Sequence, residues 1–95
     1  RTIVATPEGE AYINPTGNPG MATAGTGDVL SGIVAGFLSQ GLSARDSSIL
    51  GVYLHGLAGD IAAEKLSQTA LIASDLIKTF PEAVKRVERD CFAPA

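Results

Sequence analysis

The sequence predicts an α/β fold, to which this chain contributes a β-hairpin, a glycine-rich loop and three helices. Short β-branched stretches occur only at the start of the chain, and the residues after the glycine-rich loop follow helical spacing. Apolar residues make up 45% of the chain and its mean hydropathy is +0.23, which is high for so small a chain. Because two strands alone form only a marginal sheet, we expect a larger domain whose further strands lie upstream.

The hairpin is predicted from the first fourteen residues. Thr2–Thr6 is short and rich in β-branched side chains, which is typical of a strand. Pro7–Gly9 has the composition of a turn, and Glu10–Asn14 alternates polar and apolar residues as a returning strand does. Proline and glycine between residues 14 and 20 then predict a loop.

The first helix is expected to begin at residue 26 or 27, with Thr26 as its N-cap, and to end near residue 41. Asp28 then falls in the first turn, where the helix dipole favours a negative charge. Gly32 and Gly36 leave a bare patch on one face of this helix. Its apolar residues have helical spacing: Leu30, Ile33, Val34, Phe37 and Leu38.

The second helix is expected from residue 43 or 44 to about Leu66. One of its stripes is apolar, and a second face consists of small residues: Gly51, Gly56, Gly59 and Ala63. Each glycine inside a helix costs about 1 kcal/mol relative to alanine, so close packing on that face is the expected compensation. A helix that needs partners on two sides is predicted to be buried.

A third helix is expected to follow Ser74, its candidate N-cap. Pro81 either kinks this helix or begins a new one at its first position. Residues from about 89 to 95 resemble a tail, which contains the single cysteine, Cys91. One cysteine forms no intramolecular disulfide, and its neighbours do not suggest a metal site.

Charge and hydropathy exclude several classes of protein. The formal net charge is −3, and the chain has only 7 lysines and arginines in total. Nucleic-acid binding is therefore not expected, because the sequence has no basic patch. No apolar run approaches the ~18 residues of a membrane-spanning helix, and no basic segment precedes an apolar one at the start. The cytoplasm is the expected location.

The chemistry is concentrated in "AGTGD", Ala24–Asp28, at the start of the first helix. Backbone N–H groups at a helix start lack helical acceptors, and glycine lets a ligand approach them, so an anion such as phosphate is the expected guest. The segment lacks the Gly-Lys-Ser/Thr ending of a P-loop and the third glycine of a dinucleotide fingerprint. A glycine-rich turn that only caps the helix is the alternative interpretation.

Asp28 favours a catalytic interpretation of this loop. A carboxylate beside a phosphate is electrostatically unfavourable unless it has a role, and a base must lie within hydrogen-bonding reach of the hydroxyl that it deprotonates. Phosphoryl transfer otherwise needs positioning and charge neutralisation. Asp28 as base beside a backbone anion site is therefore coherent, although it could also serve only the helix dipole.

The stretch "NPTGNPGMATAGTGDVLSGIVAG", residues 14–36, closely resembles the signature of the NAD(P)H-hydrate dehydratase family in the ribokinase-like superfamily. "YLHGLAGDIAA", Tyr53–Ala63, and "LIASDLIKTFPEAV", Leu71–Val84, resemble later helices of that family in order and spacing. The likeness covers about residues 2–88. It implies that residues 1–95 are the C-terminal portion of one ribokinase-like three-layer αβα domain.

The resemblance implies dehydration of the hydrated cofactors (6S)-NADHX and NADPHX to NADH and NADPH, with ADP or ATP as co-substrate and Mg²⁺ offsetting phosphate charge. Phosphoryl transfer to the hydrate hydroxyl would precede elimination of phosphate. Asp28 would contact that hydroxyl and act as base. The phosphates would lie along Asn18, Ala24, Gly25, Thr26 and Gly27. The family also implies a homotetramer, and a fragment of this size is expected to have little activity alone.

Three further side chains are expected to be structural. His55 stands alone in its helix and is interpreted as a hydrogen-bonded structural histidine, Asp60 as a local cap or ion-pair partner, and Asn14 as a residue of loop geometry. Asn18 is also interpreted as a residue of loop geometry, with nucleotide contact as its second role. Two other functions stay open: a ribokinase-like kinase of a small alcohol such as a vitamin precursor, and a non-catalytic module that self-associates through its apolar helices.

Overall fold

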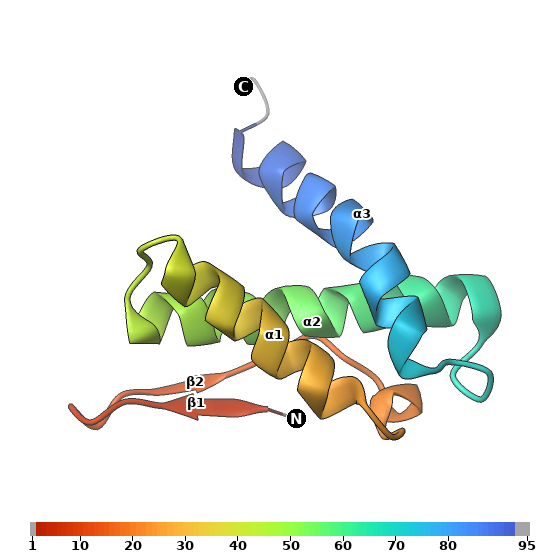
Figure 1. The fold of residues 1–95 in the computed structure, drawn as a ribbon, viewed down its shortest axis with the longest axis horizontal. Helices are drawn as coiled ribbons and strands as arrows, with labels where there is room; N and C mark the ends of the chain where they lie inside the picture. Colours follow the sequence, from red (N-terminus) through yellow and green to blue (C-terminus); the bar gives the residue numbers. More distant parts are fainter. Residues whose placement is uncertain (1, 93–95) are drawn as a thin grey trace.

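A computed structural model describes residues 2–92 of the chain, with side chains described as far as residue 90. A β-hairpin is followed by a short 3-10 turn, η1, and three helices (Figure 1). The element bounds are β1 Ile3–Ala5, β2 Ala11–Ile13, η1 Pro19–Met21, α1 Thr26–Ser39, α2 Ala44–Leu66 and α3 Ala73–Phe92. In this view α2 lies along the long axis, and the C-terminal end of α3 projects away from the hairpin.

The hairpin is antiparallel, as predicted, but its strands are shorter than residues 2–6 and 10–14. Ile3 lies opposite Ile13, and the backbone N–H of Thr6 donates to the carbonyl of Glu10 at 2.9 Å before the turn. Gly9 occupies the turn with φ +90°, which favours glycine. Ile3 and Ile13 are each 62% exposed, so one face of the hairpin is apolar and open within the described chain.

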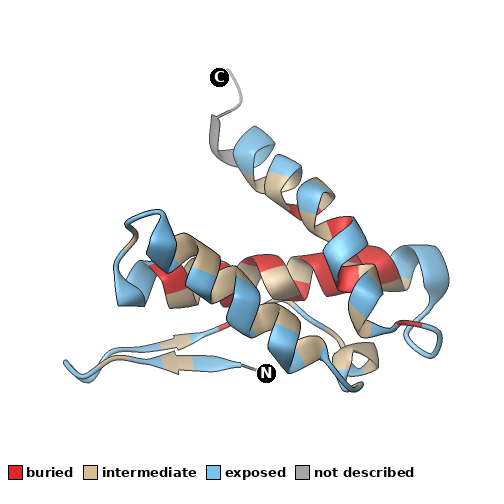
Figure 2. Cartoon of the chain, viewed as in Figure 1, coloured by how far each residue is buried: buried red, intermediate tan, exposed pale blue. Residues whose placement is uncertain are grey.

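The core is built around α2, which contacts α1, α3 and η1. Figure 2 shows that the buried residues are concentrated along this helix. One cluster joins α2 to Ala83 of α3, and a second packs around Leu71 and Leu76. The prediction that the second helix is buried is therefore confirmed.

Glycines on α2 allow three close approaches. A Cβ atom at Gly51 would overlap Val34 of α1, and Cβ atoms at Gly56 and Gly59 would overlap Thr16 and Met21 of the loop. The small-residue face predicted from the sequence therefore receives both a helix and the loop. The bare patch of α1 is different, because nothing lies within 4 Å of a Cβ atom placed at either of its glycines.

Two predicted N-caps are wrong. Thr26 is the first residue of α1 rather than its cap, because Gly25 with φ +90° makes the turn and the Thr26 hydroxyl donates to the Thr23 carbonyl instead. Ser74 lies inside α3, whose start is capped by Asp75 as it accepts from the backbone N–H of Ile72 at 2.9 Å. Ser43 does cap α2, and the expected boundaries of α1 and α2 hold within two residues.

Pro81 lies within one continuous helix, so the alternative that a new helix begins there is wrong. The proline removes a hydrogen bond to the carbonyl of Ile77, which is on an exposed turn where water can replace it. Helix α3 continues to Phe92, so residues 89–92 of the expected tail are helical, while 93–95 lie outside the described residues. Within the described chain, every helix is too short or too polar to cross a membrane.

We expect Gly56→Ala to lower the free energy of unfolding by roughly 1–3 kcal/mol, although alanine favours helix. The new methyl group would lie 2.7 Å from the carbonyl carbon of Thr16. Gly32→Ala is the matched control, because its methyl group meets nothing within 4 Å and should stabilise α1 by about 0.5–1 kcal/mol. Urea unfolding of both variants tests this, and equal shifts would contradict the close approach.

His55 gives the fold a predictable pH dependence. Its Nε2–H donates to the Thr26 carbonyl at 2.9 Å, and desolvation by burial nevertheless lowers the pKa of the imidazole below its ordinary value. A lowered folded-state pKa stabilises the fold above the ordinary value of about 6.5, and this stabilisation is lost as pH falls through the folded-state pKa. We expect His55→Gln, which keeps a donor, to lose less stability than wild type between pH 8 and pH 5 in urea unfolding. Parallel pH profiles would contradict this assignment.

Candidate functional site

The loop at residues 14–21 is held against α2 by buried polar contacts. Asn14 is 2% exposed, and its Nδ2 donates to the Val52 carbonyl and to Thr16 Oγ1, both at 3.0 Å. Thr16 Oγ1 in turn donates to the carbonyl of Tyr53 at 2.9 Å. The interpretation of Asn14 as a residue of loop geometry is confirmed.

Asp60 of α2 holds the next part of the same loop. Its Oδ2 accepts from the backbone N–H of Gly17 at 3.1 Å, and its Oδ1 accepts from Asn18 Nδ2 at 2.9 Å. The other end of the Asn18 amide accepts from the Gly20 N–H at 3.0 Å and so caps η1. The prediction of a local cap or ion-pair partner is therefore wrong, because Asp60 binds residues 42 and 43 positions away.

A cavity of about 650 Å³ lies between this loop, α2 and the start of α1. Its size is within the range of small-molecule pockets. The lining includes three of the residues expected to bind nucleotide, Asn18, Thr26 and Gly27. His55 lines the same cavity, with its Nε2 bonded to the Thr26 carbonyl as described above. Tertiary structure thus joins the "NPTGN", "GTGD" and "HGLAGD" segments around one space.

The start of α1 has the geometry of an anion site. Gly25 makes the turn into the helix at φ +90°, and its carbonyl accepts from the Val29 N–H at 3.2 Å. The N–H of Thr26 donates to the Thr23 carbonyl at 3.5 Å, while those of Gly27 and Asp28 lie in the first turn, where helical acceptors are missing and the dipole is positive. Ala24 and Gly25 are exposed and are not part of the cavity lining, so they shape the turn rather than the wall.

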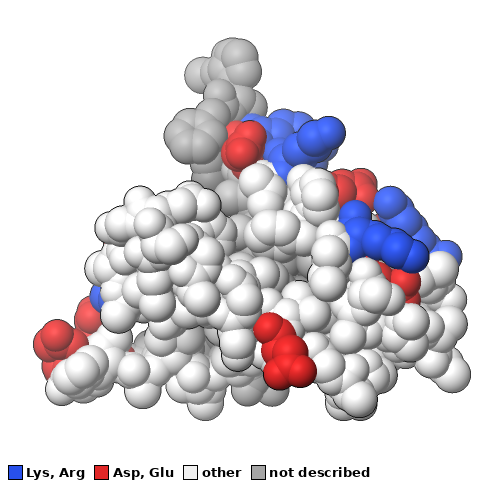
Figure 3. Space-filling view, in the orientation of Figure 1, with Lys and Arg blue, Asp and Glu red and all other residues white. Residues whose placement is uncertain are grey.

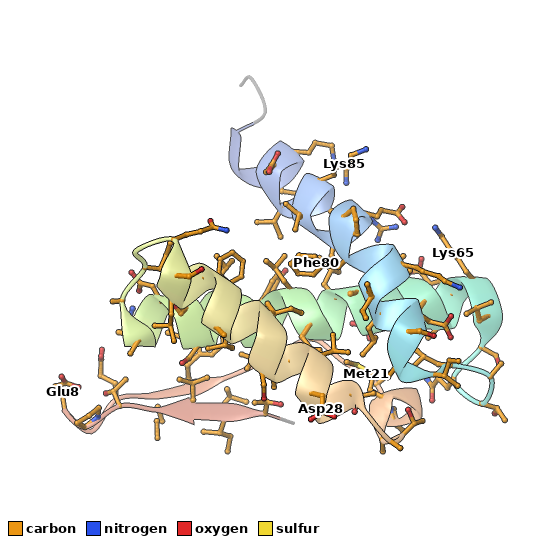
Figure 4. The ribbon with its side chains drawn as sticks, viewed as in Figure 1. Glu8, Met21, Asp28, Lys65, Phe80 and Lys85 are labelled. Carbon is orange, nitrogen blue, oxygen red and sulfur yellow. The ribbon has the colours of Figure 1, made fainter. Side chains whose placement is uncertain are left out.

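Asp28 follows Gly27 directly, but it lines a different cavity from the one that Gly27 lines. It is exposed and lies at the end of an apolar groove of about 590 Å³ between α1 and α3. Figure 4 shows Asp28 at the start of α1 and Phe80 pointing from α3 toward the same groove. The expected base and the expected phosphate site therefore lie on two sides of the same helix start. The other lining residues are Val29, Gly32, Ile33, Gly36, Phe37, Gln40 and Ile77.

Positive charge at the site comes from the backbone. Basic side chains gather over α3, whereas the surface over α1 is largely uncharged in this view (Figure 3). Within the described part of the chain, neither the 650 Å³ cavity nor the 590 Å³ groove has a lysine or arginine in its lining. Among residues 2–90, no three His, Cys, Asp or Glu side chains come together as metal ligands.

Thr16 and Asp60 are the residues of this site that sequence reasoning missed. Both act across about 40 positions in the chain, which no local pattern reveals. A weak signal did exist for Asp60. It follows Gly56 and Gly59 on the small-residue face that the sequence predicted, so a carboxylate there faces whatever packs on that face.

Comparison with known proteins identifies the family. A family model described as NAD(P)H-hydrate dehydratase matches residues 1–82. A bifunctional NAD(P)H-hydrate repair enzyme of Moorella thermoacetica is 53% identical over 90 residues, which are 95% of this chain and 17% of that protein. An ADP-dependent (S)-NAD(P)H-hydrate dehydratase of Neisseria meningitidis is 43% identical over 77 residues, covering 81% of this chain and 25% of that enzyme.

The solved structures agree with the sequence matches. An ADP/ATP-dependent NAD(P)H-hydrate dehydratase of Bacillus subtilis, co-crystallised with ATP and Mg²⁺, superposes with a TM-score of 0.83 and 34% identity. The match covers 88% of this chain and 30% of that one. This chain therefore has the hairpin and three helices of the ribokinase-like fold, as predicted, and it belongs to the NAD(P)H-hydrate dehydratase family.

Proposed function

We propose that the protein of which this chain is part restores NADH and NADPH from their hydrates, (6S)-NADHX and NADPHX, at the expense of ADP or ATP. The observation that carries this proposal is the glycine-rich start of α1, which forms one wall of the 650 Å³ cavity opposite the loop held by Asp60. The chain spans 17% to 30% of the length of the relatives described above, so the complete activity is expected to need residues beyond these 95.

The nucleotide phosphates are proposed to bind in this cavity beside Asn18, Thr26 and Gly27. First-turn N–H groups and the helix dipole would take the place of basic side chains as their partners. Ala24 and Gly25 would contribute by shaping the turn into α1. A backbone anion site suits a phosphoryl group because it offers fixed donors that need no reorganisation during transfer.

Asp28 is proposed to act as the base toward the substrate. Its carboxylate would take the proton of the hydrate hydroxyl, whose oxygen then attacks the terminal phosphorus and releases AMP from ADP, or ADP from ATP. Phosphate would next leave the ring carbon while the neighbouring carbon loses a proton, which forms the ring double bond. The Asp28 carboxylate is exposed and takes no part in the hydrogen bonds among the described residues, so it is accessible for this role.

Magnesium fits this site as a partner of the nucleotide rather than of the protein. Mg²⁺ commonly keeps several waters and is held largely by substrate phosphates, so it would need no dedicated set of protein ligands here. The ion would neutralise phosphate charge there. We also propose a cytoplasmic homo-oligomer, since the family resemblance implies one.

The proposed activity is tested by incubating the full-length protein with hydrated NADH, Mg²⁺ and either ADP or ATP. We expect the absorbance of the reduced nicotinamide to return with release of phosphate. A kinase of a small alcohol would instead accumulate a phosphorylated product without that absorbance. A self-associating module would bind no nucleotide in calorimetry. Either of these outcomes would refute the proposal.

We expect Asp28→Asn in the full-length protein to lower turnover by roughly 100-fold or more, because the amide cannot accept the proton. Affinity for ADP should stay within a few fold, since the phosphates bind the backbone. Asp46→Asn is the matched control, because Asp46 is also a first-turn acid but belongs to α2 and is remote from both cavities. Kinetics and calorimetry measure the two effects, and near-normal turnover of the Asp28 variant would refute its role as base.

A further inference from the structure

We propose that Asp60 is a positioning residue that sets the shape of the nucleotide-binding loop by orienting the Asn18 amide. This inference rests on the proposed function, because it gives the "HGLAGD" segment a role in the same site. Asp60 lies on the face of α2 that receives the loop, and each of its carboxylate oxygens accepts one hydrogen bond from the loop. Both of its carboxylate oxygens are therefore engaged by residues 42 and 43 positions away in the chain.

The hydrogen bonds of Asp60 allow only one orientation of Asn18. A carboxylate can only accept, so the Asn18 Nδ2 must face Asp60, and its Oδ1 is left to accept from the Gly20 N–H. One N–H of the amide and its carbonyl oxygen are thereby each engaged within the protein. Asn18 would thus contribute to nucleotide binding through the position of the loop rather than by offering its side chain to the ligand.

The loop that Asp60 holds is also a wall of the cavity. Gly17, Asn18 and Pro19 line it on one side, and Thr26 and Gly27 line it on the other. Loss of an anchor at position 60 would let the first wall move relative to the start of α1. Because nucleotide affinity depends on both walls, such a movement should raise the KM for nucleotide more than it lowers kcat.

Replacing Asp60 by asparagine introduces a donor where only acceptors fit. The introduced amide would satisfy Gly17 through its oxygen, but its NH₂ would face the NH₂ of Asn18. Turning the Asn18 amide over would only move the conflict to the Gly20 N–H. The exchange Asn18→Asp with Asp60→Asn restores every partner, because the carboxylate at position 18 accepts both from the Gly20 N–H and from the amide at position 60.

The test uses the full-length protein and measures kcat, KM for ADP and the calorimetric Kd for ADP with Mg²⁺. We expect Asp60→Asn to raise KM and Kd about tenfold, in line with the loss of a charge-assisted hydrogen bond, while kcat stays within about threefold. The double exchange should recover most of the Tm that the single variant loses, whereas KM and Kd should stay raised because its carboxylate at position 18 lies beside the phosphates. Because it keeps all hydrogen bonds, it should fold even if the single variant does not.

Thr79→Val is the control for a general loss of stability. It removes the bond from Thr79 Oγ1 to the Ala58 carbonyl of α2 at 2.8 Å, away from the loop, so Tm should fall while KM is unchanged. The inference is overturned if Asp60→Asn lowers Tm without raising KM and Kd, or if the double exchange recovers none of the lost Tm. Failure of the proposed function looks different: wild type would bind ADP without repairing hydrated NADH, and the Kd values would still decide the role of Asp60.

Discussion

The structure depends on the contact between the loop at residues 14–21 and one face of α2. The Cβ atoms of a helix normally limit how closely a loop can approach its backbone. Gly56 and Gly59 lack that atom where Thr16 and Met21 approach α2. The close approach brings the side chains of Asn14, Thr16 and Asn18 within hydrogen-bonding distance of α2. The loop is consequently tied to the surface of α2 by these hydrogen bonds, with Asn14 as its buried residue.

Helix α2 has different partners on its two sides. Apolar residues such as Leu54 and Ile61 pack with α1 and α3, while Gly56 and Gly59 receive the loop. Each glycine weakens the isolated helix by about 1 kcal/mol, so the close packing and the satisfied polar groups must offset this cost. A further contact of α2 places the start of α1 at the edge of the cavity, because His55 donates a hydrogen bond to the carbonyl of Thr26, the first residue of α1.

The start of α1 separates two different environments. On one side is a cavity with polar walls, and on the other an apolar groove that ends at Asp28. A phosphoryl donor is best bound by fixed dipoles, whereas an uncharged ring bearing a hydroxyl is best bound by apolar side chains. A helix start between two such surfaces suits a reaction in which a phosphoryl group passes from one ligand to the other.

Much of this protein could be predicted from the sequence, because local rules govern it. Spacing predicted the hairpin and three helices, which the structure confirms. The anion site beside Asp28, inferred from glycine and a carboxylate at a helix start, stays a prediction. The caps at Thr26 and Ser74 were wrong because a positive-φ glycine and a neighbouring aspartate compete at short range. Only the tertiary structure decided which cavity Asp28 lines and which residues Asp60 binds. Both depend on contacts between segments far apart in the chain, and neither periodicity nor turn chemistry carries information about such contacts.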